Sequence, residues 1–165
     1  MKVLFRVGLA AAVLALGFWI WTVLFPRPEK IIREHLKAMA QCASFAPNEG
    51  ALSRLTNLEK LGGFFATDAR IVFDGPEGRR HTVNGRDDIT YAARAMRGHS
   101  SAMQVKFLDV KVIVGLEKQT AQAELTVRVS VPEDKDWIVQ EMRFFFRKIN
   151  SHWLVIRAET VNPLS

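Results

Sequence analysis

The sequence predicts an α+β domain in which three helices cover one face of a curved antiparallel sheet, behind a single transmembrane helix. Three observations lead to this prediction. Residues 7–25 carry no formal charge, apolar residues recur at helical spacing in three segments between residues 29 and 96, and a period of two governs the rest of the chain. We therefore expect an N-terminal anchor at residues 1–26 and the α+β domain at residues 27–165.

Length and composition limit the protein class. At roughly 150 residues per domain, 165 residues make about one domain. Hydrophobic residues at 48% and charged residues at 24% are ordinary globular values, which excludes a disordered or collagen-like chain. Cys42 is the only cysteine, and no His or Cys residues have the spacing of a zinc site. We expect packing to hold the domain together, with no metal and no cofactor.

The uncharged run has the length of a membrane span. As a helix, its 19 residues extend for roughly 28 Å at ~1.5 Å per residue, close to the ~30 Å hydrocarbon core of a bilayer. Trp19 and Trp21 come near its end, where indole rings suit the headgroup boundary, and Pro26 interrupts the helix. A cleaved signal peptide and a buried core helix are the alternatives. The bulky residues 23–25 before the proline make a poor cleavage site, which favours an uncleaved anchor.

The charges on the two sides of the run bear on the orientation of the protein in the membrane. Lys2 and Arg6 precede it, whereas Arg27, Lys30 and Arg33 follow it closely, so the positive charges nearly balance. A short, positively charged N-terminal tail is typical of signal anchors whose tail stays inside. We therefore expect a single-pass membrane protein whose domain is extracytoplasmic, and periplasmic in a Gram-negative host.

The charge after Pro26 is mixed. Those residues include 21 Lys and Arg against 17 Asp and Glu, interspersed along the chain. The longest basic cluster, residues 79–81, is predicted to lie on a turn after residues 75–78. Nucleic-acid binding requires a basic stripe with aromatic platforms, and this pattern is missing. We expect a solvated surface and no nucleic-acid partner.

Three helices and one short strand are predicted in the first half of the domain. The first helix covers residues 29–45, the second begins with Asn48 as N-cap and ends at Gly62 and Gly63, and the third follows Asn84 and Gly85. Residues 69–73 form the strand. The apolar stripes of the three helices are Ile32, Leu36, Met39 and Ala43; Leu52, Leu55, Leu58 and Leu61; and Ile89, Ala92, Ala93 and Met96.

Four long strands are predicted at residues 104–114, 119–131, 137–149 and 152–161, and their short connections favour antiparallel pairing. Sorting each strand by parity separates an apolar face from a charged face, so one face packs under the helices. The predicted inner face is Leu108, Val110, Val112, Val114, Ala121, Ala123, Leu125, Val127, Val129, Met142, Phe144, Phe146, Leu154, Ile156 and Ala158. On the outer face, Glu124 and Arg143, or Arg157 and Glu141, are placed to pair.

Three segments resemble the nuclear transport factor two-like, or ketosteroid-isomerase-like, superfamily. They are the helix-to-strand segment at residues 58–73, the Asn-Gly-Arg-Asp-Asp-Ile entry to the third helix at residues 84–89, and the closing hairpin at residues 145–156. The likeness covers about residues 29–162. It implies a cone-shaped α+β domain with a pocket between the helices and the concave sheet, often dimeric through the outer sheet face. Members include isomerases, dehydratases, cyclases and binding domains without catalysis.

The predicted inner face carries few groups for acid–base chemistry. Isomerases and dehydratases of this fold need a carboxylate base and a hydrogen-bond donor inside the cone. Here the acids Asp109, Glu124, Glu141 and Glu159 all fall on the outer face. We therefore predict a membrane-tethered, non-catalytic domain that binds a hydrophobic ligand or a protein partner. The residues expected to line its pocket are Leu125, Val127, Phe144, Phe146, Tyr91 and Trp137.

Two alternatives remain open at this stage. One is an isomerase- or dehydratase-type enzyme acting on a small apolar or lipid-like substrate, with His99 as base and Tyr91 as hydrogen-bond donor. The other is a structural homodimer joined through the charged outer face of the sheet.

Overall fold

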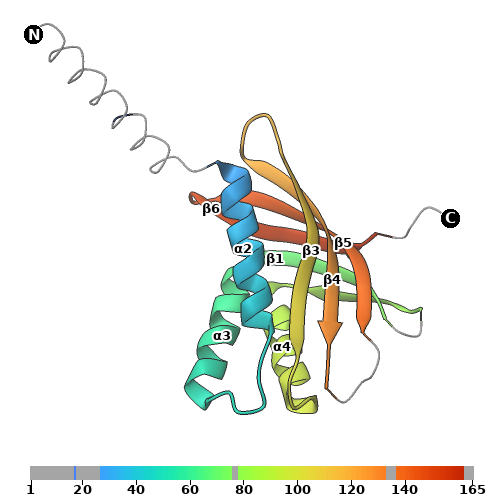
Figure 1. Cartoon of the computed structure of the whole chain (residues 1–165). Helices are drawn as coiled ribbons and strands as arrows, with labels where there is room; N and C mark the ends of the chain where they lie inside the picture. The colour runs from blue at the N-terminus through green and yellow to red at the C-terminus, as the bar shows by residue number, and fades with distance from the viewer. Residues whose placement is uncertain (1–16, 18–26, 76–77, 133–136, 162–165) are drawn as a thin grey trace, which may run out of the picture.

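Three helices lie on one face of a strongly curved, six-stranded sheet (Figure 1). The computed structural model describes Gly17 and residues 27–75, 78–132 and 137–161. The predicted membrane span at residues 7–25 falls, apart from Gly17, outside the described residues. Among the described residues, no helix combines the length and the apolar character needed to cross a bilayer.

The elements follow the order that the sequence predicts, with one addition. The helices are α2 (Pro28–Ala43), α3 (Ala51–Gly63) and α4 (Arg86–His99). The added strand is β2, which falls on the basic cluster that we assigned to a turn. The strands are β1 (Phe65–Asp74), β2 (Arg80–Asn84), β3 (Gln104–Val114), β4 (Thr120–Ser130), β5 (Ile138–Ile149) and β6 (His152–Thr160).

The sheet is not wholly antiparallel, which corrects the prediction. Its strand order is β2-β1-β6-β5-β4-β3, and β1 pairs with β6 in the parallel direction. Hairpins and short turns join β1 to β2 and β3 through β6 in succession, so those pairs are antiparallel. No hairpin joins β1 to β6, because the rest of the domain separates them in sequence. That long connection allows the parallel direction.

α2 buries the stripe that its spacing predicts, apart from the partly buried Ala43, whereas α4 buries Ile89 of its stripe and leaves Met96 51% exposed. Pro28 begins α2, where a missing N–H costs nothing. α3 begins at Ala51 with Gly50 as N-cap, two residues later than predicted, because residues 46–49 form a turn. Leu58 and Leu61 are buried, but Leu52 and Leu55 in its first turns are 79% and 56% exposed. The prediction of a buried apolar stripe on α3 is therefore wrong for the first half of the helix.

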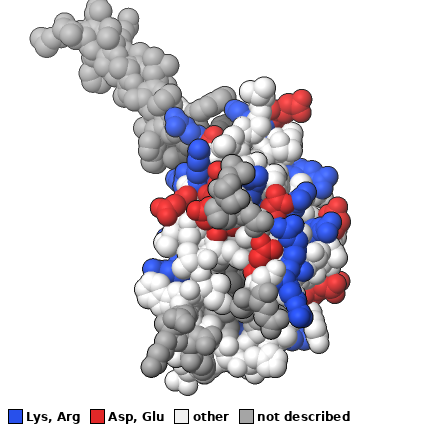
Figure 2. Space-filling model, turned by 90° about the vertical axis from the view of Figure 1, so that its right-hand side faces the viewer, with Lys and Arg blue, Asp and Glu red and all other residues white. Residues whose placement is uncertain are grey.

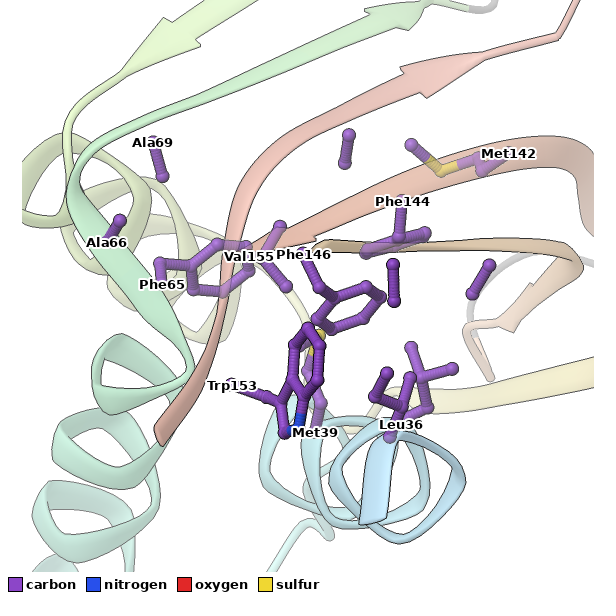
Figure 3. Close-up of a cluster of buried hydrophobic side chains, with 14 of the residues drawn as sticks. Leu36, Met39, Phe65, Ala66, Ala69, Met142, Phe144, Phe146, Trp153 and Val155 are labelled. Carbon is purple, nitrogen blue, oxygen red and sulfur yellow. The ribbon is translucent and has the colours of Figure 1, made fainter. Parts of the chain in front are cut away.

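The core lies between α2 and the middle of the sheet (Figure 3). Leu36 and Met39 of α2 meet Phe146 of β5 and Trp153 of β6, and all four are at most 3% exposed. Cys42 is buried with them, and burial raises the pKa of its thiol. The thiol thus stays protonated and acts as a small apolar group.

The predicted parity is confirmed on β4 and β5. Ala121, Ala123 and Leu125 alternate as buried residues, and Met142, Phe144 and Phe146 do the same on the neighbouring strand. On β3 the parity changes at a bulge, where Asp109 has a φ of 52° and the pairing with β4 shifts. The added residue places Val105 and Phe107 on the inner face and Leu108 opposite Thr126 on the outer face. The prediction for Leu108 is therefore wrong.

A second bulge reverses the parity of β6. The partners of Phe145 and Phe146 are Arg157 and Val155, so β6 holds one extra residue at this point. Trp153 and Val155 consequently point inward before the bulge and Ala158 after it, all at most 3% exposed. Leu154 and Ile156, predicted as inner residues, are only partly buried.

Ion pairs form on the outer face of the sheet, where residues of both charges alternate along the strands. Arg143 and Glu124 pair on β5 and β4 with an N···O distance of 3.0 Å, which confirms one predicted pair. Arg157 instead pairs with Glu159 of its own strand at 2.5 Å, so the predicted Arg157–Glu141 pair is wrong. Figure 2 shows Lys, Arg, Asp and Glu intermixed over the upper part of one side of the molecule, while its lower part is mostly uncharged.

Candidate functional site

An apolar cavity lies between α4 and the inner face of the sheet. Its volume is about 310 Å³, within the usual size range of ligand pockets. Side chains from α2, α3, α4, β1, β2, β3, β4, β5 and β6, with Met103 just before β3, line it. All of the described lining residues are Ala, Val, Leu, Ile, Met or Phe, so none of these side chains offers a nitrogen or oxygen.

Small residues on α4 open this cavity. Ile89, Ala92, Ala93 and Met96 face it at helical spacing, as the sequence predicts. The two alanines carry only a methyl group, so the helix leaves space above the sheet. Across the cavity, Ala158 of β6 is likewise small and fully buried. A larger side chain at any of these positions fills volume that is otherwise empty.

Methionines are concentrated around the cavity. The chain has five, and Met39, Met96, Met103 and Met142 all line it. Met96 is also 51% exposed, which places it at the border between the cavity and solvent. Methionine is unbranched and polarisable, so it adapts to apolar groups of different shapes. The sequence does not indicate this grouping, because the four methionines come from separate elements.

Two of the six residues predicted to line the pocket do so. Val127 and Phe144 line the cavity, whereas Leu125 and Phe146 are packed in the adjoining core. Tyr91 is 73% exposed and is not among the lining residues. Trp137 is 61% exposed and lines a separate groove beside residues 44–49, with the Arg128 guanidinium 4.4 Å from its ring centroid. A ligand-binding role for these residues stays a prediction.

The groups invoked for catalysis are not in the cavity. His99 is the exposed last residue of α4, and neither it nor Tyr91 lines the cavity. Asp109, Glu124 and Glu141 line a separate pocket of about 290 Å³ on the outer face of the sheet. Among the described residues, no three His, Cys, Asp or Glu side chains cluster closely enough to hold a metal ion.

A buried ion pair joins the end of α4 to the loop before α3. Arg97 Nη1 lies 2.7 Å from Glu49 Oε2, and the two side chains are 2% and 8% exposed. Arg97 Nη2 donates to the Cys42 carbonyl, and Asn57 donates to the same Glu49 carboxylate. Sequence reasoning missed this cluster. The signal was present, because Arg97 follows Ile89 and Ala93 at steps of four on the inward side of α4.

His35 makes the stability of the domain sensitive to acid. Its ring packs edge-on against Phe64 at 5.7 Å, and Nδ1 is buried without a hydrogen-bond partner among the described residues. Burial lowers the pKa of His35 from 6.5, although the Trp153 backbone opposes this change. Below about pH 6.5 the unfolded chain therefore binds a proton that the folded domain does not. Stability is unaffected above this value and decreases as the pH falls from it toward the folded-state pKa.

We expect His35→Leu to remove part of this acid sensitivity. Urea unfolding at about pH 7 and about pH 5 measures the loss of stability between the two conditions. The loss should be smaller for His35→Leu than for the wild type. His99→Gln, at an exposed histidine, should keep the wild-type loss. Equal losses in His35→Leu and the wild type would contradict the assignment.

Solved structures share this fold. An NTF2-like protein of unknown function from Pseudomonas putida is 16% identical, with a TM-score of 0.61 over 83% of this chain and 87% of that one. An NTF2-like protein with a cystatin-like fold from Novosphingobium aromaticivorans is 19% identical, with a TM-score of 0.60 over 92% and 86%. A third, described as a candidate scytalone dehydratase from the same organism, is 11% identical, with a TM-score of 0.59 over 82% and 83%. These likenesses establish an NTF2-like fold. No family model and no curated protein matches the chain.

Proposed function

We propose that this protein is a membrane-tethered, non-catalytic domain that binds a hydrophobic ligand in the cavity under α4. One observation carries the proposal: all the described side chains that line the cavity are apolar. Binding there gains free energy by removing apolar surface from water, roughly 25 cal/mol per Å² before the costs of association. A polar or charged ligand finds no side-chain hydrogen-bond partner to replace its lost hydration.

The size of the cavity limits the ligand. At roughly 30 Å³ for each water-sized group, 310 Å³ holds about ten such groups. An alkyl chain of medium length or a small ring system fits this limit, with any polar group left at the solvent border near Met96. The methionine lining favours tolerance toward ligand shape over selection of one compound.

The tether rests on the sequence. The uncharged run at residues 7–25 has the length of a bilayer span, and the domain begins directly after it. We retain the extracytoplasmic placement of the domain as part of the proposal. Retention of the full chain in membranes after an alkaline carbonate wash tests the tether, and release into the supernatant would contradict it.

Filling the cavity should abolish ligand binding. In the domain produced from Arg27 onward, with its fold verified by circular dichroism, we expect Ala93→Phe to weaken binding of the apolar dye N-phenylnaphthylamine at least tenfold, about 1.4 kcal/mol. Dye fluorescence measures the affinity. Because Ala93 borders empty space, the thermal midpoint should not fall as it does when a filled core is overpacked.

Ala95→Phe is the matched control. Ala95 lies on the same helix but is exposed and does not line the cavity. We expect this variant to bind the dye as the wild type does. Equal affinities of Ala93→Phe and Ala95→Phe for the dye would show that binding occurs elsewhere.

A homodimer through the outer sheet face is compatible with this function. The Arg143–Glu124 pair lies on that face, with side chains 34% and 40% exposed. Reversing the charge with Arg143→Glu should lower the molecular mass in solution if the face joins two copies. An unchanged mass would count against the dimer.

A further inference from the structure

We infer that one end of the domain rests on the membrane surface and inserts Leu116 among the lipid headgroups. This inference rests on the proposed tether. The surface, called here the membrane-proximal end, comprises residues 27–34 at the start of α2, the β3–β4 loop at residues 115–119 and the β5–β6 turn at residues 148–151. Figure 1 shows the start of α2 and the β3–β4 loop at the same end of the molecule.

The chain leaves little room between the proposed span and this surface. The uncharged run ends at Phe25, and α2 begins at Pro28. An extended chain covers at most about 3.6 Å per residue, so the first residue of α2 lies within roughly 11 Å of Phe25. The headgroup region on each side of a bilayer is about 5–7 Å thick. The start of α2 therefore lies among the headgroups or within roughly 6 Å of them.

The β3–β4 loop presents an apolar side chain at this end. Leu116 is fully exposed, so its side chain contributes nothing to the packing of the domain. The loop is a closed structure, because Gly115 N–H donates to the Thr120 carbonyl at 2.8 Å and Lys118 N–H donates to the Gly115 carbonyl at 2.9 Å. These hydrogen bonds fix the backbone of the loop, so insertion orders little further chain and removes the apolar leucine side chain from water.

The membrane-proximal end carries a small excess of basic residues. Lys148 N–H donates to the Gln119 carbonyl at 2.8 Å, which brings the end of β5 beside the β3–β4 loop. Among the described residues of the membrane-proximal end, five are basic and three are acidic. An anionic leaflet attracts the net positive charge of this end. The basic residues are Arg27, Lys30, Arg33, Lys118 and Lys148, and the acidic ones are Glu29, Glu34 and Glu117.

The cavity lies toward the opposite end of the domain. Its lining includes Met39 and Ala43 of the second half of α2, Val105 near the start of β3, and Val127 and Val129 near the end of β4. In Figure 1 these parts lie away from the start of α2 and from the β3–β4 loop. Membrane contact through Leu116 therefore leaves the cavity border free for a ligand or its carrier.

The experiment compares a fluorescent label on the membrane-proximal end of the domain with one outside that end, in the full chain. In a Cys42→Ala background, Leu116→Cys and the control Leu52→Cys are labelled with the dye NBD and reconstituted in vesicles of three parts phosphatidylcholine and one part phosphatidylglycerol. Leu52 is 79% exposed on α3 and lies outside the membrane-proximal end. We expect blue-shifted emission at position 116 and at least twofold stronger quenching by nitroxide-labelled lipid than at position 52. In vesicles without phosphatidylglycerol the difference should decrease.

The outcomes separate the inference from the proposed function. Equal quenching at positions 116 and 52 in a chain that resists the alkaline wash overturns the inference and leaves the tether intact. Release of the chain by the wash overturns both the tether and the inference. A cavity-binding defect in Ala93→Phe is independent of either result, because that residue lies outside the membrane-proximal end.

Discussion

Arg97→Met should destabilise the domain by about 3–5 kcal/mol, which is the usual cost of removing one partner of a buried ion pair. The substitution removes the cation from the Glu49 side chain, which is 8% exposed in the intact pair, and among the described residues leaves the Asn57 amide as its donor. It also releases the Cys42 carbonyl. Urea unfolding of the domain measures the loss, and the midpoint should fall with little change in slope.

Two further variants show whether the pair is the cause. Replacing both partners, in Arg97→Met with Glu49→Met, should recover part of the lost stability, because no uncompensated buried charge remains. Arg143→Ala breaks an ion pair that is 34% and 40% exposed, and should cost at most about 1 kcal/mol. A loss in Arg97→Met no larger than that in Arg143→Ala would contradict the structural role of Arg97.

Phe146→Ala should cost about 3–5 kcal/mol, the usual cost of truncating a fully buried aromatic residue. Phe146 is 1% exposed and packs against Phe144 at a ring separation of 6.5 Å. It also lies beside Trp153 in the core (Figure 3). Its removal leaves a void that the surrounding strands cannot close. Thermal unfolding followed by near-ultraviolet circular dichroism measures the loss.

The preceding residue is the matched control. Phe145 lies on the outer face of β5, where the Arg157 guanidinium is 5.8 Å from its ring centroid. We expect Phe145→Ala to cost about 1 kcal/mol or less. Similar losses in Phe145→Ala and Phe146→Ala would mean that the inner and outer faces of β5 are not distinguished as the structure has them.

The period of two located the four long strands because one sheet face is buried, and on β4 and β5 it also identified the inner residues. On β3 and β6 it was correct after the bulge, at Val110, Val112, Val114 and Ala158. It was wrong up to the bulge, at Leu108, Leu154 and Ile156, because one extra residue exchanges the two faces there. Asp109 carried a weak signal of the bulge, because aspartate is depleted in strands and enriched in left-handed backbone. The parallel pairing of β1 with β6 depends on tertiary contacts and leaves no local pattern.

The apolar character of the candidate site was predictable, but its position was not. Strand parity predicted that Val127 and Phe144 line the pocket. Met103 and Val105 line the cavity because the bulge in β3 turns the residues before it toward the inner face of the sheet. Tyr91 and Trp137 were selected for their chemistry, and both side chains lie mainly in solvent. Sequence spacing indicates which face of an element is apolar, but it does not locate the empty volume between elements.

The central claim is that the cavity under α4 binds apolar ligands, and its four methionines report on it directly. We propose a titration of the domain from Arg27 onward, labelled with carbon-13 in its methionine methyl groups, with decanol, followed by nuclear magnetic resonance. Met39, Met96, Met103 and Met142 all line the cavity, so their four signals should shift together and saturate at one ligand per domain. A shift confined to the half-exposed Met96, or four signals that do not move, would contradict the claim.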